Sequence, residues 1–235
     1  MMAAVRWREV HDALEREIGE GVYPQGARLP VEDTLAERFG VHRHTVRRAV
    51  AALAQRGILT VQQGRGTFVR RGAVDYRVGR KTRFTEIVTG QQRSPTRRLL
   101  RAVEMPADAA TAAALGLGAG AACFMLETLD EVDGVPIGLC SHHFPVARVP
   151  GLIDAYIETG SITGALERHG LGDYERRRTS VTARMPTAEE AALLRQPRDQ
   201  PVLLIESLNV DPAGAPLEYG VARSVAERVK MVFET

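Results

Sequence analysis

The stretch that decides the fold runs from residue 29 to residue 71 and reads LPVEDTLAERFGVHRHTVRRAVAALAQRGILTVQQGRGTFVRR. Its apolar residues recur at helical spacing in two short segments, one ending at Gly40 and one beginning near His42. The residues that face inward are Leu35, Ala36 and Phe39 in the first segment and Val46, Ala49, Val50 and Leu53 in the second. Two short helices joined by a glycine turn predict a helix-turn-helix.

The exposed face of the second predicted helix carries side chains suited to DNA. They cluster in its first two turns and comprise His42, Arg43, His44, Thr45, Arg47 and Arg48. In a helix-turn-helix, this end of the second helix enters the major groove. Arginine can bond guanine through two hydrogen bonds, and threonine or histidine can reach a base edge or a phosphate. We therefore predict that this face contacts DNA.

A β-hairpin is predicted directly after the second helix. From Gly57 the sequence alternates between apolar and polar residues as far as a glycine-flanked arginine, and a second alternating run follows. This is the pattern of the wing in a winged helix. Gly64 and Gly66 let the backbone approach the sugar-phosphate wall, and Arg65 at the tip can enter the minor groove.

The charge of the chain is distributed unevenly, although its net value is only +2 over 235 residues. Residues 38–71 contain eight arginines and no Asp or Glu, whereas residues 1–37 contain eight acids. A local excess of positive charge favours a polyanionic partner, because arginines replace the counterions of DNA phosphates. Combined with the predicted helices and hairpin, it indicates double-stranded operator DNA as the partner.

The rest of the chain repeats itself at an offset of about 80 residues. Met105-Pro106 and Met185-Pro186 each open a predicted short helix with proline at its first position. The apolar strands that follow lie at residues 122–129 and 202–208, and the acidic turns after them at residues 133–136 and 211–216. Each turn leads into a returning strand, and Asp-Gly hairpin turns favour an antiparallel sheet.

These patterns predict an α+β protein with two domains. We expect a winged helix-turn-helix at residues 1–71, a linker at residues 72–80, and a pseudo-twofold antiparallel-sheet domain at residues 81–235. We expect the last of these to bind a small-molecule effector, since concave sites form where two halves of a domain meet.

Candidate effector-binding residues lie at two predicted helix starts in this domain. Thr85 opens one helix, and Ser161 and Thr163 open another, where backbone N–H groups and hydroxyls suit an anion. Plain N-capping accounts for the same hydroxyls. Arg83, beside Thr85, favours the anion site.

Further candidates lie on predicted strands. His142 and His143 are neighbours, so their side chains point to opposite faces and cannot share one metal ion. One of the pair, taken as His142, lines the expected ligand site, and the other is structural or faces solvent. Glu218 and Tyr219 alternate in the same way, and each is either a pocket wall or the edge of the core.

Other patterns exclude several classes of function. The sequence has no GxGxxG or Walker-type loop, no Ser-His-Asp or Cys-His arrangement and no metal-ligand spacing, so we expect no cofactor, no metal and no catalysis.

Cys123 and Cys140 are expected to be small buried apolar residues in a reducing compartment. No apolar stretch approaches the ~20 residues of a membrane span, so we expect a cytoplasmic protein. The run from Glu175 to Arg178 is interpreted as a solvated strand or a domain-interface cation.

The quoted stretch resembles the DNA-binding domain of the GntR family over essentially its whole length. The resemblance implies that Arg43, Thr45 and Arg47 contact bases and phosphates and that Gly64 is the wing contact. Asp33 departs from the family, because many members carry a DNA-contacting arginine there.

The second domain resembles the UTRA effector-binding domain of HutC-type GntR regulators, and among these the phosphonate-metabolism (PhnF-type) regulators. The matching residues are Asp75-Tyr76, Arg83-Phe84, Val132 to Val135, His142 to Phe144 and Pro216 to Tyr219. UTRA domains share the fold of chorismate lyase, which makes an enzyme acting on a small acid the rival interpretation. Phosphosugar-sensing relatives often carry arginines where this sequence has Thr128, Asp130 and Glu131, so the ligand here is less anionic or binds differently.

The resemblance implies a homodimeric repressor of genes for phosphonate or phosphate uptake and breakdown. The alternative is the control of another catabolic operon, with a sugar-phosphate or amino-acid-derived effector. A dimer would present two winged helices to a pseudo-palindromic operator. The effector would shift the spacing of the two winged helices, with the hinge expected at residues 72–80.

Overall fold

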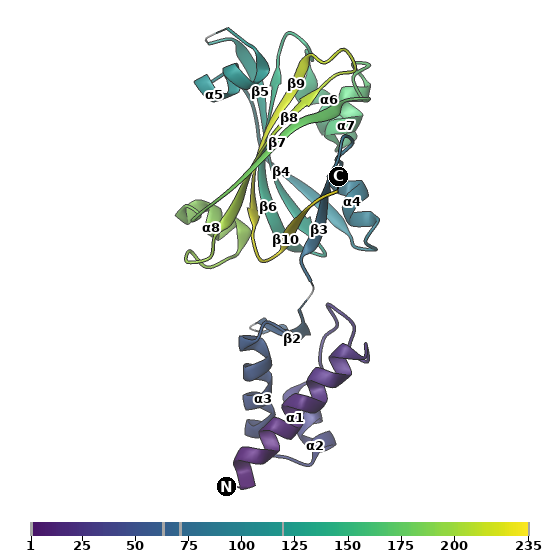
Figure 1. The fold of residues 1–235 in the computed structure, drawn as a ribbon, viewed down its shortest axis with the longest axis vertical. Coiled ribbons are helices and arrows are strands. Elements are labelled where there is room, and N and C mark those ends of the chain that lie inside the picture. Colours follow the sequence, from purple (N-terminus) through teal and green to yellow (C-terminus); the bar gives the residue numbers. More distant parts are fainter. Residues whose placement is uncertain (1, 63, 71, 119, 235) are drawn as a thin grey trace. The chain divides into compact units, whose positions relative to one another are not determined.

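The chain folds into two units that divide between Gly72 and Ala73 (Figure 1). The computed structural model describes residues 2–62, 64–70, 72–118 and 120–234, with the side chains of residues 2–5 excepted. Gln63 of the expected wing and Arg71 of the basic block lie outside the described residues.

The first unit contains the predicted helix-turn-helix and wing. Its elements are α1 (Met2–Gly19), α2 (Glu32–Phe39), α3 (Arg43–Gln55), β1 (Leu59–Gln62) and β2 (Gly66–Val69). Gly40 ends α2 in the left-handed conformation, with φ at 61°, and the chain turns at once into α3. The predicted inward-facing residues of α3 are buried, and they pack against Leu14 of α1 and Leu35 of α2. The fold predicted for this unit is confirmed.

The wing is an antiparallel hairpin whose register pairs Leu59 with Val69 and Gln62 with Gly66. Gly66 has a φ of 119°, a conformation that side chains rarely adopt. A Cβ atom at this position would lie 2.7 Å from Nε of Arg28. A glycine is therefore favoured at the tip of the wing on conformational grounds, and a larger residue would also displace the side chain of Arg28.

The second unit is built on one six-stranded antiparallel sheet with the strand order β4-β5-β6-β9-β8-β7. The strands are β4 (Pro95–Pro106), β5 (Ala122–Val132), β6 (Val135–Pro145), β7 (Glu175–Arg184), β8 (Val202–Val210) and β9 (Pro216–Val225). Asp133 and Gly134 form the two-residue turn between β5 and β6, both with positive φ, as an Asp-Gly hairpin turn requires. The α+β, antiparallel prediction is confirmed.

The internal repeat of the sequence corresponds to the two halves of this sheet. The order β4, helix, β5, β6 recurs as β7, helix, β8, β9, and the halves meet where β6 pairs with β9. The repeated helices are α5 (Ala109–Leu115) and α8 (Ala188–Leu194). The prediction that proline occupies their first position is wrong. Asp108 and Thr187 cap them by accepting hydrogen bonds from the backbone N–H groups of Thr111 and Glu190, so both prolines precede the caps.

The prediction of a linker at residues 72–80 is also wrong for most of its length, because residues 74–78 form a strand of the second unit. This strand, β3 (Val74–Val78), pairs in parallel with β10 (Val229–Phe233) near the end of the chain. Val74 is fully buried, and it packs with Phe84 and Val229. Its apolar residues alternate with Asp75 and Arg77, a strand pattern whose partner lies about 150 residues away in sequence.

Helices cover both faces of the sheet (Figure 1). One face carries the β3–β10 pair with α4 (Phe84–Thr89), α6 (Leu152–Thr159) and α7 (Ile162–Glu167). The other carries α5 and α8. The largest core cluster lies under α6 and α7, around Phe144, Leu126 and Leu166. None of the helices in the described part of the chain has the length and apolar character that a membrane span requires.

We expect Leu166→Ala to lower the free energy of unfolding of the second unit by about 2–5 kcal/mol, because this side chain is fully buried in the core. Ile157→Ala is the matched control on the preceding helix. Its side chain is 65% exposed, so its effect should stay within about 0.5 kcal/mol. Urea unfolding followed by circular dichroism measures both. Equal losses in the two variants would contradict the core assignment.

Candidate DNA interface and effector pocket

The start of α3 presents the predicted DNA-contacting side chains at the surface. Arg43 and Arg47 are each about half exposed, with 51% of the side chain accessible. His42 is the N-cap, and its Nδ1 accepts a hydrogen bond from the backbone N–H of His44. The two imidazole rings stack at 5.2 Å between centroids, and Thr45 is half-buried beside them. The residues predicted from the sequence therefore lie together on one helix end.

Glu32, at the start of α2, holds both arginines of this helix end. Arg47 donates to it from Nη2 at 2.8 Å, and Arg43 donates from Nε at 2.9 Å. The hydrogen bond from Arg47, with a smaller contribution from Arg43, lowers the pKa of the Glu32 carboxyl in spite of partial burial. Both guanidinium groups are thus fixed in orientation by one carboxylate before any DNA is present.

Asp33, the departure from the family pattern, adds a second negative charge at the same place. Its carboxylate lies 3.5 Å from Nε of Arg43 and is 65% exposed. A family arginine at this position would extend the positive surface, whereas Asp33 reduces it.

Much of the basic block is neutralised by the acids that precede it in sequence. Arg38 donates to Glu17 and to the hydroxyl of Tyr23, and Arg56 donates to Glu15. Arg48 lies over the ring of Trp7, with 4.7 Å between its guanidinium carbon and the ring centroid. These contacts join α1 to α2 and α3. The sequence-level charge asymmetry therefore overstates the positive charge available to DNA.

A groove runs between the start of α3 and the wing, lined by Arg28, Val31, Arg43, Arg47, Gly64 and Thr67. Arg65 is exposed at the tip of the wing, and its backbone N–H donates to the carbonyl of Gln62. Gly64 has a φ of 73°, and a Cβ atom there would meet no other atom, so its requirement is conformational. The groove brings Arg43 and Arg47 of the predicted helix residues together with Gly64 of the wing.

His11, Asp12 and Glu15 on α1 lie close enough for their ligand atoms to share a metal ion, all within 4.8 Å. Nη1 of Arg56 approaches the same group, at 3.3 Å from Nε2 of His11 and at 2.5 Å from Glu15. A guanidinium in this position supplies the positive charge that a metal would bring. The cluster therefore fits a structural ion-pair network better than a metal site.

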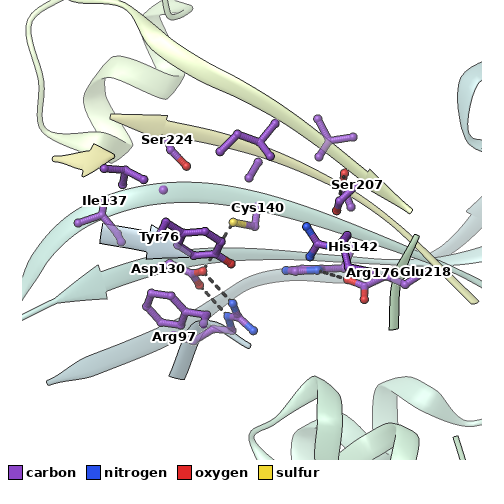
Figure 2. A pocket seen from close by; sticks show the side chains of 17 residues that line it. Tyr76, Arg97, Asp130, Ile137, Cys140, His142, Arg176, Ser207, Glu218 and Ser224 are labelled. Atoms are coloured by element: carbon purple, nitrogen blue, oxygen red, sulfur yellow. Dashed lines mark hydrogen bonds and ion pairs between the residues drawn. The ribbon is translucent and has the colours of Figure 1, made fainter. Parts of the chain in front are cut away.

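The second unit contains a pocket on the face of the sheet that carries β3 and α4 (Figure 2). Its cavity volume is about 80 Å³. Apolar side chains of Phe84, Ile137, Ile205 and Val229 form part of its wall. The polar side chains come from strands β4 to β9 and from Tyr76 of β3.

Arg97 of β4 and Asp130 of β5 form a two-bonded ion pair in this pocket. The Nε and Nη2 atoms of Arg97 donate to the two carboxylate oxygens at 2.7 and 2.8 Å. Burial opposes the charge of Arg97, yet the attraction of Asp130 raises its pKa further. Asp130 is one of the three positions noted above at which phosphosugar-sensing relatives often carry arginine. In this chain the guanidinium at this place belongs to Arg97 of the neighbouring strand, and Asp130 neutralises its charge.

His142 and Glu218 form a second pair across the junction of the two halves. His142 Nδ1 lies 2.6 Å from one oxygen of Glu218, and the side-chain amide of Asn209 donates to the other at 2.6 Å. Burial raises the pKa of Glu218, but the bonds from His142 and Asn209 and the charge of Arg176 outweigh it and hold the pKa at about 2. Glu218 is therefore ionised at any physiological pH.

Arg176 of β7 is a pocket residue that the sequence analysis assigned to a solvated strand or domain interface. Its Nε donates to the amide oxygen of Asn209 at 2.6 Å, and its Nη1 lies 3.4 Å from the hydroxyl of Thr179. Among the described residues, Arg176 forms no ion pair. Three consecutive arginines gave no signal for which one faces the sheet. The register shift between Arg176 and Arg178 decides this, and it is not readable from the sequence.

The other predicted effector residues lie outside the pocket wall. Arg83 donates to the carbonyl of Tyr174 at 2.9 Å and stacks on the Tyr174 ring. Ser161 caps α7 by accepting from the N–H of Gly164, and Thr163 bonds the hydroxyl of Tyr174. The remaining cases are Thr85, which is exposed, and Tyr219, which bonds Glu206 on the opposite face of the sheet beside His143. The structure thus brings together only His142 and Glu218 of the predicted set.

Both cysteines are buried and unpaired, as expected for small apolar residues. Cys140 lies in the pocket wall, and burial raises the pKa of its thiol well above the ordinary value. Neither cysteine is therefore suited to act as a nucleophile.

Comparisons with known proteins match both units. The model of bacterial regulatory proteins of the gntR family matches residues 7–69, and the UTRA domain model matches residues 90–230. An uncharacterised HTH-type transcriptional regulator of Rhizobium meliloti (strain 1021) is 38% identical over 100% of this chain and 96% of its own length. The probable transcriptional regulator PhnF of Escherichia coli (strain K12) is 33% identical over 97% of this chain and 95% of its own.

A solved structure agrees with the same assignment. The crystal structure of PhnF from Mycobacterium smegmatis has a TM-score of 0.67 and 28% sequence identity, covering 96% of this chain and 98% of that one. The matching relatives are transcription regulators rather than enzymes. With its winged helix-turn-helix and its UTRA domain, the chain belongs to the GntR family of DNA-binding transcription regulators, in the HutC subfamily.

Proposed function

We propose that this protein is a homodimeric repressor that leaves its operator when a small effector binds the pocket of the UTRA domain. The observation that carries the proposal is the pocket itself, in which buried charged side chains from both halves of the domain converge. The genes it controls would serve the uptake or breakdown of phosphonate or phosphate. This assignment follows the likeness to PhnF regulators, of which one is 33% identical.

Operator binding would use the groove between α3 and the wing. Arg43 and Arg47 line that groove, and by resemblance they match, with Thr45, the base and phosphate contacts of the family. His42 and His44 would add contacts from the same helix end. Gly64 and Arg65 would contact the sugar-phosphate backbone or the minor groove. A second copy would place an identical surface on the other half-site, as a pseudo-palindromic operator requires.

Coupling between the pocket and DNA would pass through β3. This strand begins at Val74, directly after the boundary of the two units, and Tyr76 within it lines the pocket. A ligand that moves Tyr76 therefore acts on the segment that leads to the DNA-binding unit. The hinge is accordingly placed before Val74 rather than along residues 72–80. The ligand shifts the equilibrium only by its difference in affinity between the two states.

Footprinting of the purified protein on fragments of its own genome, with and without phosphonates, tests the proposed function. We expect a short palindrome upstream of phosphonate or phosphate genes, with protection lost when one phosphonate is added. Protection beside unrelated catabolic genes, or release by a sugar phosphate alone, would reject the phosphonate assignment and keep the regulator.

We expect Arg47→Ala to weaken operator binding by roughly 1–3 kcal/mol, because a guanidinium that reads a base edge is lost. Arg16→Ala, an exposed arginine near the end of α1, should change binding little. Fluorescence anisotropy with a labelled operator measures both variants at one fixed salt concentration. A loss of the same size in both would mean that only general charge, and not base reading, had been removed.

We expect Glu32→Gln to raise the affinity for random DNA. The ratio of operator affinity to random-DNA affinity should fall about fivefold. The variant removes a negative charge and frees Arg43 and Arg47 from their fixed orientations, an effect of about 1 kcal/mol. Glu37→Gln, an exposed acid of the same helix, controls for charge alone. Competition between operator and random DNA measures the ratio. An unchanged ratio would show that Glu32 does not orient the arginines.

A further inference from the structure

The charges inside the pocket are nearly balanced, but they are not all engaged in the same way. Arg97 is paired with the carboxylate of Asp130 through two hydrogen bonds from its Nε and Nη2 atoms. Glu218 is bonded by His142 and by the amide of Asn209. Arg176 bonds only neutral oxygens, those of Asn209 and Thr179. In the described part of the chain, Arg176 is therefore the pocket guanidinium that has no carboxylate partner.

Arg176, Asn209 and Glu218 form one row across three neighbouring strands. The register pairs Arg176 of β7 with Asn209 of β8, and Asn209 with Glu218 of β9. The amide of Asn209 accepts from Arg176 and donates to Glu218, so it joins a cation to an anion. Neighbouring strands lie about 4.8 Å apart, so the backbones of Arg176 and Glu218 are roughly 10 Å apart. The pocket thus holds a positive pole and a negative pole a short distance apart.

A purely anionic ligand fits this arrangement poorly. Its charge would be attracted by Arg176 but repelled by the carboxylates of Glu218 and Asp130 in the same wall. Glu218 stays ionised because its pKa is held at about 2, against the effect of burial, by His142, Arg176 and Asn209. A ligand with one negative and one positive group places an anion beside Arg176, which has no carboxylate partner, and a cation beside the carboxylate of Glu218. A second negative charge in the ligand would be buried unpaired.

We propose that the effector is a small zwitterion, with its anionic group bound by Arg176 and its ammonium group bound by Glu218. The inference rests on the proposed function, because it specifies the ligand of the same pocket. Arg176 would bond a phosphonate or a carboxylate through its Nη1 and Nη2 atoms, since Nε already donates to Asn209. Ser207, in the same wall between these strands, offers a hydroxyl to either group.

Isothermal titration of the full-length protein with matched probes tests this inference. The first probe is 2-aminoethylphosphonate; ethylphosphonate lacks its ammonium group and ethylamine lacks its anionic group. We expect 2-aminoethylphosphonate to bind at least roughly tenfold more tightly than either, since each charged hydrogen bond contributes a factor of this size. β-Alanine, with a carboxylate in place of the phosphonate, identifies which anionic group Arg176 prefers.

Four variants test which side chain binds the anionic group of the ligand and which binds the ammonium group. Arg176→Gln should lower the affinity for the zwitterion at least roughly tenfold, and Arg176→Lys should keep part of it. Glu218→Gln should remove the preference over ethylphosphonate. Arg178→Gln, exposed on the same strand, is the control and should leave binding unchanged. Operator binding and thermal melting of each variant confirm that it is folded.

Three outcomes would overturn the inference. They are equal binding of ethylphosphonate and 2-aminoethylphosphonate, unchanged binding by Arg176→Gln, and the absence of binding by both zwitterions. None of these bears on operator binding, which is measured separately by footprinting. If an anion without an ammonium group released the operator, the repressor proposal would stand and the zwitterion would be rejected.

Discussion

The pairing of β6 with β9 is the interaction on which the second unit depends. It joins the two repeated halves, and its register sets His142 opposite Gly220 and His143 opposite Tyr219. Because side chains alternate along each strand, this register decides which histidine enters the pocket. Gly220 is part of the same constraint, since a Cβ atom there would lie 2.7 Å from the hydroxyl oxygen of Ser207. A slip of one residue would turn the pocket residues of β6 toward α5 and α8.

Local patterns in the sequence were sufficient to predict the first unit. The glycine that ends α2, the apolar face of α3 and the Gly64–Gly66 tip are all short-range signals, and each has a direct backbone explanation. The repeat predicted the antiparallel sheet for the same reason, because each half contains its own hairpin. Strand β3 was missed because its partner β10 lies at the other end of the domain.

The effector site was only partly predictable, because it is defined by register rather than by motif. His142 and Glu218 were named from alternation along single strands. Arg97 and Arg176 lie on the two outer strands of the sheet and enter the site only through pairings with β5 and β8. The charge count was misleading in the first unit for a related reason, because folding places Glu32 against Arg47. The arginines that matter chemically are distinguished by their partners, not by their number.

The parallel pairing of β3 with β10 has a mechanical consequence. A pull along the axis of β3 would load all the hydrogen bonds of this strand pair together, in shear, instead of opening them one at a time. The strand pair would therefore transmit a displacement along β3 to β10 with little loss. Tyr76 of β3 and Val229 of β10 also line the pocket, so the strand pair and the ligand site have these two residues in common. A truncation that removed β10 would leave β3 without its paired strand, so β3 could move relative to the six-stranded sheet even if that sheet stayed folded.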